Sequence, residues 1–273
     1  MDDAFKPFME AAYAGDLETY QALLAAQPDL VTQGSAISHP NLFQFIAVEG
    51  GMGKIPRAAD FARAMVAAGA PLGGAFVAAA SVGSRELVDL LIEASVAIEA
   101  EAPWTALEET LYWANQEIGL YLHKDHGATA PSLRAAAELG RLDLLAGFFA
   151  DDGSLRPEAG PVRFPFGLEE SSDPQDVLDQ AFLLALKNLQ YEAASLLLER
   201  GAEVNAIPPG NHERCTPLHQ AVYKDDARMI EWLLARGARA TIADPRFNST
   251  AIGWAQHFGH TAHEERLKAA AGG

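Results

Sequence analysis

Apolar residues recur at helical spacing in short segments along the chain, and the pattern is clearest in residues 216–240. In that segment (TPLHQAVYKDDARMIEWLLARGARA), one face of a first short helix carries Leu218, Ala221 and Val222. One face of a second short helix carries Met229, Ile230, Leu233 and Leu234. Apolar residues three or four positions apart share a helix face, so the segment predicts two amphipathic helices in succession.

The ends of these two helices are marked by residues that favour helix boundaries. The hydroxyl of Thr216 is able to cap the first helix, and Pro217 stands at the first helical position, where its missing N–H does no harm. Gly237 follows the last apolar pair, as expected where a helix ends in a left-handed residue. The segment therefore predicts one complete helix–turn–helix unit.

This unit resembles an ankyrin repeat, because it contains TPLH followed by LLARGA, and residues 196–206 (LLLERGAEVNA) are similar to the end of such a repeat. One repeat cannot bury its own apolar face, so the resemblance requires neighbouring units. The small residue expected between the two helices of each unit recurs along the chain. These turn positions are Gly15, Gly50, Gly83, Ala114, Gly140, Leu189, Asp225 and Gly259.

The spacings between the turn positions are 35, 33, 31, 26, 49, 36 and 34 residues, and most lie near the ~33 of ankyrin repeats. The resemblance implies an all-α solenoid of about eight helix pairs, with residues 1–273 forming a single domain. The interval of 26 implies a trimmed hairpin around residues 126–132. The interval of 49 implies an insertion, assigned to residues 151–176.

The insertion at residues 151–176 is rich in proline, glycine and acidic residues, which predicts an extended loop. Within the insertion, residues 162–166 are the part that is able to pack against the rest of the chain or to pair as a strand. A loop of this length on a repeat scaffold either covers the binding face or is a tolerated surface excursion, and the sequence leaves both open.

The ankyrin resemblance implies that partners contact the hairpin tips and the last two residues of each first helix, directly before the turn positions. These residues are rich in rings, although each ring has the alternative of packing under a neighbouring hairpin as core. Trp104 and Trp254 are expected to be buried. The candidate binding residues before the turns are Tyr13, Tyr112, Trp113, Glu138, Lys187, Tyr223, Lys224, His257 and Phe258. The hairpin tips add residues 208–214 (PPGNHER) and 244–248 (DPRFN). In the second tip, Arg246 and Phe247 are suited to an acidic or aromatic partner group.

The chain carries 37 acidic and 20 basic residues, a formal net charge of −17. That balance argues against nucleic acid and anionic membrane surfaces as partners, since both attract basic patches. The single cysteine excludes an internal disulfide framework and fits a reducing compartment. Since the sequence shows no signal peptide and no membrane-spanning run, we expect a cytoplasmic protein.

The sequence matches metal-binding and catalytic motifs only weakly. The histidines at 257, 260 and 263 and the set His212, Cys215 and His219 have spacings that would admit a metal. However, His219 is the histidine of TPLH, which the resemblance makes a structural hydrogen-bonding residue, and ligands three residues apart on a helix diverge by about 60°. The GGMGK segment departs from the phosphate-binding loop pattern. We therefore expect no metal, no cofactor and no catalytic residue.

The leading hypothesis is a protein-binding module without catalysis, whose partner is another protein of basic or mixed charge. The alternative is a small-molecule-binding or enzymatic ankyrin protein. In that case the 151–176 loop would close over a pocket that contains the ring residues. His257 and Glu138 would then act in acid–base catalysis on the bound molecule. A third hypothesis is an inhibitor that mimics nucleic acid, which requires carboxylates clustered on one surface. The sequence names no partner.

Overall fold

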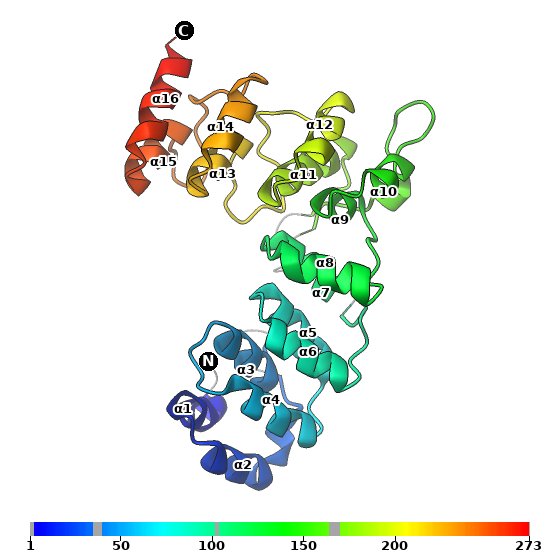
Figure 1. Ribbon diagram of the computed structural model, residues 1–273, viewed down its shortest axis with the longest axis vertical. Coiled ribbons are helices and arrows are strands. Elements are labelled where there is room, and N and C mark those ends of the chain that lie inside the picture. Colours follow the sequence, from blue (N-terminus) through cyan, green and yellow to red (C-terminus); the bar gives the residue numbers. More distant parts are fainter. Residues whose placement is uncertain (1–2, 35–39, 102–103, 164–169, 273) are drawn as a thin grey trace. The chain divides into compact units, whose positions relative to one another are not determined.

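The computed structural model describes residues 3–34, 40–101, 104–163 and 170–272 (Figure 1). Over these residues the chain forms sixteen α-helices, three short 3-10 helices and isolated β-bridges, without longer strands. The expected all-α class is therefore confirmed. Within the described ranges, no helix combines the length and the apolar character needed to cross a membrane.

The chain divides into two compact units, Met1–Ala130 and Pro131–Gly273. Each unit contains four helix pairs, so the expected eight pairs are all present. The first unit contains α1 (Lys6–Ala14), α2 (Leu17–Ala26), α3 (Leu42–Gly51), α4 (Ala58–Ala67), α5 (Leu72–Ser81), α6 (Arg85–Glu93), α7 (Ala106–Tyr112) and α8 (Gln116–Asp125). The second contains α9 (Leu133–Glu138), α10 (Leu142–Gly147), α11 (Pro174–Lys187), α12 (Tyr191–Glu199), α13 (Pro217–Tyr223), α14 (Ala227–Leu234), α15 (Ala251–Phe258) and α16 (Thr261–Ala271). That all eight pairs form one continuous domain stays a prediction.

Seven of the eight expected turn positions adopt the left-handed backbone conformation that ends the first helix of a pair. They include three residues other than glycine, namely Ala114, Leu189 and Asp225, with φ of 62°, 60° and 54°. The eighth position, Gly50, was wrong. It lies inside α3, where a Cβ would come within 2.6 Å of the Ala58 Cβ. The left-handed residues between α3 and α4 are Gly53, with φ of 76°, and Arg57, with φ of 54°.

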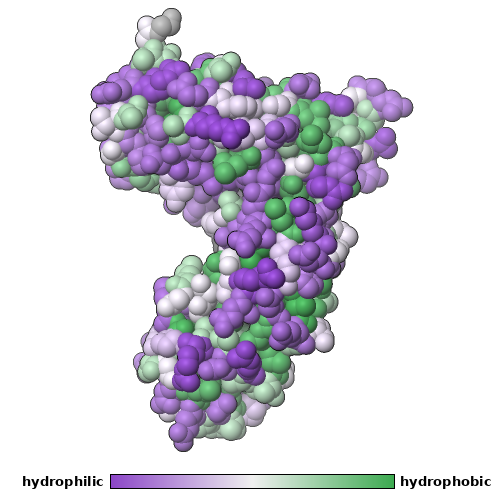
Figure 2. Space-filling view, viewed as in Figure 1, coloured by the Kyte–Doolittle hydropathy of each residue, from purple (hydrophilic) through white to green (hydrophobic). Residues whose placement is uncertain are grey.

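Each unit has an apolar core between its helices. In the first unit, Tyr20 is fully buried and packs edge-to-face on Phe8 and Phe61, at centroid distances of 5.7 and 5.1 Å. In the second, the faces expected from the sequence pack inward, with Leu218 and Leu233 buried among their neighbours. The face shown in Figure 2 is mostly hydrophilic, with smaller apolar areas between the polar residues. The amphipathic pattern thus places the apolar stripes where burial stabilises the pairs.

The insertion starts after α10 and ends at Asp173, because residues 174–176 already form the first turn of α11. Its described part is anchored to the second unit. Val162 is fully buried, and its N–H donates to the Ser171 carbonyl at 2.8 Å. The Gln180 amide donates to the Arg163 carbonyl at 2.9 Å. This fits the expectation that Val162 can pack, while residues 164–166 of the same expectation lie outside the described residues.

Candidate functional site

The start of α13 has the hydrogen bonds that TPLH predicts. The Thr216 hydroxyl accepts from the His219 N–H and lies 2.7 Å from its Nδ1, while the Nε2 of that ring lies 3.0 Å from the Ser249 carbonyl. A carbonyl only accepts, so Nε2 carries the proton and Nδ1 accepts from Thr216. Burial lowers the pKa of His219, although the bond to Ser249 acts against it. The imidazole therefore joins the start of α13 to the hairpin before α15.

That hairpin is organised by the carboxylate of Asp244, which is buried. Its Oδ1 accepts from the backbone N–H groups of Arg246 at 2.9 Å and Phe247 at 2.6 Å. Its Oδ2 accepts from the Ser249 N–H at 3.1 Å and from the Trp254 indole at 2.9 Å. Burial raises the pKa of Asp244, but these hydrogen bonds outweigh it and the net pKa is lowered. The loop and the indole are thus held by one charged group.

Next to this hairpin lies a cavity of about 400 Å³ within the second unit. We call it the aromatic pocket. Its walls come from the hairpin before α13, the end of α13, the hairpin before α15, and α15 itself. Its lining residues are His212, Glu213, Tyr223, Arg246, Phe247, Ser249, Trp254, His257 and Phe258.

Four rings form an edge-to-face cluster in the aromatic pocket. The Tyr223 ring lies 6.5 Å from Trp254 and 5.7 Å from Phe258, and the Trp254 and Phe258 centroids are 6.1 Å apart. Phe247 joins from the hairpin at 6.2 Å from Trp254. Trp254 is buried, whereas Tyr223, Phe247 and Phe258 are 53%, 62% and 42% exposed. Three exposed rings packed on a fixed indole make a preformed apolar surface.

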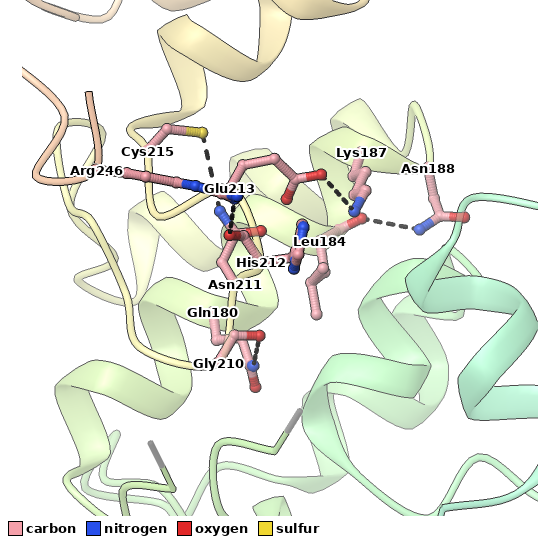
Figure 3. A network of polar contacts seen from close by, with 10 residues as sticks. All are labelled: Gln180, Leu184, Lys187, Asn188, Gly210, Asn211, His212, Glu213, Cys215 and Arg246. Carbon is pink, nitrogen blue, oxygen red and sulfur yellow. Dashed lines mark hydrogen bonds and ion pairs between the residues drawn. The ribbon is translucent and has the colours of Figure 1, made fainter. Parts of the chain in front are cut away.

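The charged side chains around the aromatic pocket differ in whether an opposite charge pairs with them. The guanidinium of Arg246 lies 5.1 Å from the Phe247 ring centre and donates to the His212 carbonyl at 3.3 Å. Glu213 faces away from Arg246 in its ion pair, which joins its Oε1 to the Lys187 ammonium at 3.7 Å (Figure 3). Burial lowers the pKa of Lys224, the nearby positive charge of Lys187 lowers it further, and Asp226 and then Glu213 act in the opposite direction. The carboxylate of Glu213 is thus engaged by Lys187, whereas Arg246 has no carboxylate partner within the described residues.

Cys215 lies beside this network but is not part of the cavity lining. It is fully buried, and the Asn211 amide lies 3.9 Å from its sulfur (Figure 3). Burial strongly raises the pKa of the Cys215 thiol. A buried thiol that resists ionisation is a poor nucleophile, so the residue has a structural role in this site.

The aromatic pocket brings together five of the eleven sequence-predicted residues, and these are Tyr223, Arg246, Phe247, His257 and Phe258. Four further residues line the pocket. His212 and Glu213 belong to the hairpin tip 208–214 that the sequence predicted as a contact region, whereas Ser249 and Trp254 were not expected at the site. Trp254 was expected to be buried, which is confirmed, but its role in the pocket was not expected.

Three predicted binding residues are buried, which corrects their assignment to a partner surface. Tyr112 is fully covered and packs edge-to-face against Trp104 and Trp113, at 5.9 and 5.2 Å. Glu138 and Lys187 are also buried. Their side chains are closed to a partner, and Trp104 and Glu213, which contact Tyr112 and Lys187, belong to the same chain.

The other predicted residues lie outside the aromatic pocket. Trp113 and Lys224 are half-buried. Tyr13 is exposed in the first unit, where its hydroxyl donates to Glu49 at 3.1 Å. Their roles in partner binding stay predictions.

A second notable group in the first unit is the buried carboxyl of Glu109. Its Oε1 accepts from the Trp113 indole at 2.9 Å, and its Oε2 accepts from the Trp104 indole. Burial raises the pKa of Glu109 to about 7, and the hydrogen bond from Trp113 reduces that rise. Two tryptophans thus hold a carboxyl that titrates near neutral pH.

The C-terminal histidines form ion-pair contacts between repeats. His260 Nδ1 and His263 Nε2 approach the same Asp225 oxygen at 3.3 and 2.8 Å. In the ranges that the structure describes, no three His, Cys, Asp or Glu side chains gather as a metal site. Asp225 occupies a left-handed turn, so these contacts link the turn after α13 to α16.

Comparison with known proteins locates the clearest family signal in the second unit. The family model of ankyrin repeats (many copies) matches residues 179–234. Among solved structures, the crystal structure of the human ASB11 ankyrin repeat domain is similar, with 17% sequence identity and a TM-score of 0.41. That match covers 91% of this chain and 90% of the other. The search of curated proteins gave no significant match.

Proposed function

Because residues 179–234 belong to the ankyrin-repeat family, we propose that the chain is a protein-binding module and that the aromatic pocket is its contact site. The observation that carries this proposal is the cluster of three exposed rings around a fixed indole. The family generally acts as a scaffold for protein interaction, and function in repeat arrays resides on surface sites outside the helix core.

The rings are suited to supply binding energy. Tyrosine and phenylalanine offer large contact areas with few rotatable bonds, so little conformational entropy is lost when they are covered. Tyr223 and Phe258 already pack on each other and on Trp254. A partner therefore meets a surface that needs little rearrangement, which favours affinity.

The experiment that tests this proposal compares paired alanine variants in affinity capture from a native lysate. The double variant Tyr223→Ala, Phe258→Ala removes two exposed rings and keeps Trp254. A matched control is Leu142→Ala, since Leu142 is 41% exposed in the same unit but does not line the pocket. Circular dichroism checks that all variants remain helical.

We expect the double variant to retain a tenth or less of the partner, because two such rings contribute on the order of 2–3 kcal/mol together. The Leu142→Ala chain should capture the partner as the unchanged chain does. Equal capture by all three chains would show that partners do not use the aromatic pocket.

One observation favours a small molecule as a second candidate ligand, because a cavity of about 400 Å³ lies within the range of small-molecule sites, roughly 300–1,000 Å³. The enzymatic form of this alternative relied on Glu138 and on closure by the 151–176 loop. Glu138 is buried, and the described part of that loop contributes no lining residue. Native mass spectrometry of the purified chain would reveal a copurified small molecule as added mass.

A further inference from the structure

We infer that the aromatic pocket receives a large apolar side chain of a partner segment, and that Arg246 binds a carboxylate next to that side chain. This inference rests on the proposed function and specifies the chemistry of its partner. Two observations support it. The cavity walls are apolar, and the positive charge of Arg246 has no carboxylate partner in the part of the chain that the structure describes.

The apolar part follows from the walls. Tyr223, Phe247 and Phe258 surround the cavity with partly exposed carbon surface, and the buried indole of Trp254 lies against all three rings. Covering this surface with an aromatic or long aliphatic side chain removes apolar area from water on both sides. A single anchor of this kind is the usual centre of a binding site.

The charged part follows from Arg246. Within the described residues, its guanidinium donates to the His212 carbonyl and lies beside Phe247, but forms no ion pair with a carboxylate. Its side chain is exposed at the pocket. A guanidinium has several donors in a planar fork, so it retains donors for a carboxylate of the partner.

The two acidic groups near Arg246 are engaged elsewhere. The Asp244 carboxylate accepts from three backbone N–H groups of its own hairpin and from the Trp254 indole N–H. Glu213 is paired with Lys187 at 3.7 Å, and Lys224 senses the charges of both. Arg246 is therefore the charged lining side chain that lacks an oppositely charged partner among the described residues, although the chain as a whole carries −17. Since like charges repel, an acidic group is favoured over a basic one here.

A ring-lined cavity also has the option of binding a cation on the ring faces. The positive charge of Arg246 in the lining opposes that option. Glu213 nevertheless lines the cavity, and its Oε2 has no hydrogen-bond partner within the described part of the chain. This oxygen is suited to accept an uncharged N–H of the bound segment, such as a backbone amide.

The test is a selection of peptides from a random displayed library on the full chain, followed by affinity measurements on synthetic copies of the selected peptides. The variants are Arg246→Gln, Arg246→Glu and the matched control Arg239→Gln. Arg239 is also exposed in the second unit but does not line the pocket, so both glutamine variants remove one positive charge. Added salt tests the charge contribution.

We expect the selected peptides to carry an aromatic or long aliphatic residue within two positions of Asp or Glu. Arg246→Gln should weaken their binding about tenfold, because it removes a charge-assisted hydrogen bond to the partner carboxylate. Arg239→Gln should leave it unchanged. Selection on Arg246→Glu should favour Lys or Arg at the position of the acid.

Four results would overturn the inference. Enrichment of lysine or arginine on the unchanged chain would identify a cation site. Equal weakening by Arg246→Gln and Arg239→Gln would remove the specific carboxylate contact. Peptides that bind the Tyr223→Ala, Phe258→Ala chain as well as the unchanged chain, or no selected peptide at all, would remove the pocket as a segment site. The proposed function is judged separately, by capture of the native partner.

Discussion

The Trp254 indole N–H donates to the Asp244 carboxylate at 2.9 Å, across ten positions of sequence. This bond joins α15 to the hairpin that precedes it and fixes the ring on which Tyr223, Phe247 and Phe258 pack. The geometry of the aromatic pocket therefore depends on one buried carboxylate. A site whose central ring is held in this way is preorganised for a partner.

Asp244→Asn should destabilise the second unit by about 2–3 kcal/mol, because an amide cannot accept from all four donors that the carboxylate satisfies. Urea denaturation followed by tryptophan fluorescence would measure this loss. Stability unchanged from that of the original chain would mean that the four bonds contribute nothing net.

The same carboxylate gives a pH dependence. The pKa of Asp244 is lowered in the folded state relative to its ordinary value of 3.8. Its contribution is therefore fully present above pH ~4 and is lost as the pH falls through the folded pKa. Asp244→Asn should lack this part of the acid sensitivity.

Glu109 has the opposite dependence. Burial raises its pKa from 4.5 to about 7, so the folded state holds a proton that the unfolded state releases between these values. Stability should thus fall by about 3 kcal/mol as the pH rises from 4.5 to 7. Glu109→Gln should flatten that slope, measured by urea denaturation at pH 5 and pH 8.

The control for this experiment is Glu18→Gln, which removes an exposed acid of the same unit. Its pH slope should equal that of the unchanged chain. Because Trp104 and Trp113 both donate to Glu109, their fluorescence should also change between pH 5 and pH 8 in the unchanged chain and not in Glu109→Gln. A slope that persists in the glutamine variant would contradict the assignment.

The left-handed turns predict a reciprocal pair of effects. Ala114 has φ of 62°, where a Cβ is unfavourable, so Ala114→Gly should stabilise the first unit by about 0.5–1 kcal/mol. Gly140 has φ of 68°, and a Cβ there would lie 2.2 Å from the Gln190 side-chain oxygen, so Gly140→Ala should destabilise the second unit by about 1–2 kcal/mol. Thermal denaturation would measure both, and effects of the same sign would contradict the turn geometry.

Glu213→Gln should destabilise the second unit by about 2–3 kcal/mol at pH 7, because it leaves Lys187 without the carboxylate 3.7 Å away. Adding Lys187→Met should recover part of that loss. Urea denaturation at pH 7 would measure both changes, and equal stability of the unchanged chain and Glu213→Gln would contradict a stabilising ion pair.

The sequence was sufficient for the helix pairs because the repeat has strong local signals. Thr216, Pro217 and Gly237 mark helix ends through their own backbone preferences, and the structure confirms each position. The prediction of a turn at Gly50 was wrong for a related reason. A glycine is suited both to a left-handed turn and to close helix packing, and the sequence does not distinguish these uses.

The candidate site could be predicted only in part, because exposure depends on what the neighbouring repeat covers. Tyr112 and Tyr223 occupy equivalent positions before their turns, yet the first is fully buried and the second is 53% exposed. The roles of Glu213 and Trp254 depend on contacts with Lys187 and Asp244, which lie 26 and 10 positions away. Such contacts are determined by packing, which periodicity does not encode.

All lining residues of the aromatic pocket fall within residues 212–258, a single continuous stretch of chain. Since each unit of a repeat array contacts mainly its neighbours, most of the pocket is encoded by this stretch, and the ion pair of Glu213 adds only Lys187 of the preceding α11. A graft of the pocket onto another array of helix pairs would therefore need to begin at α11 and end with α15.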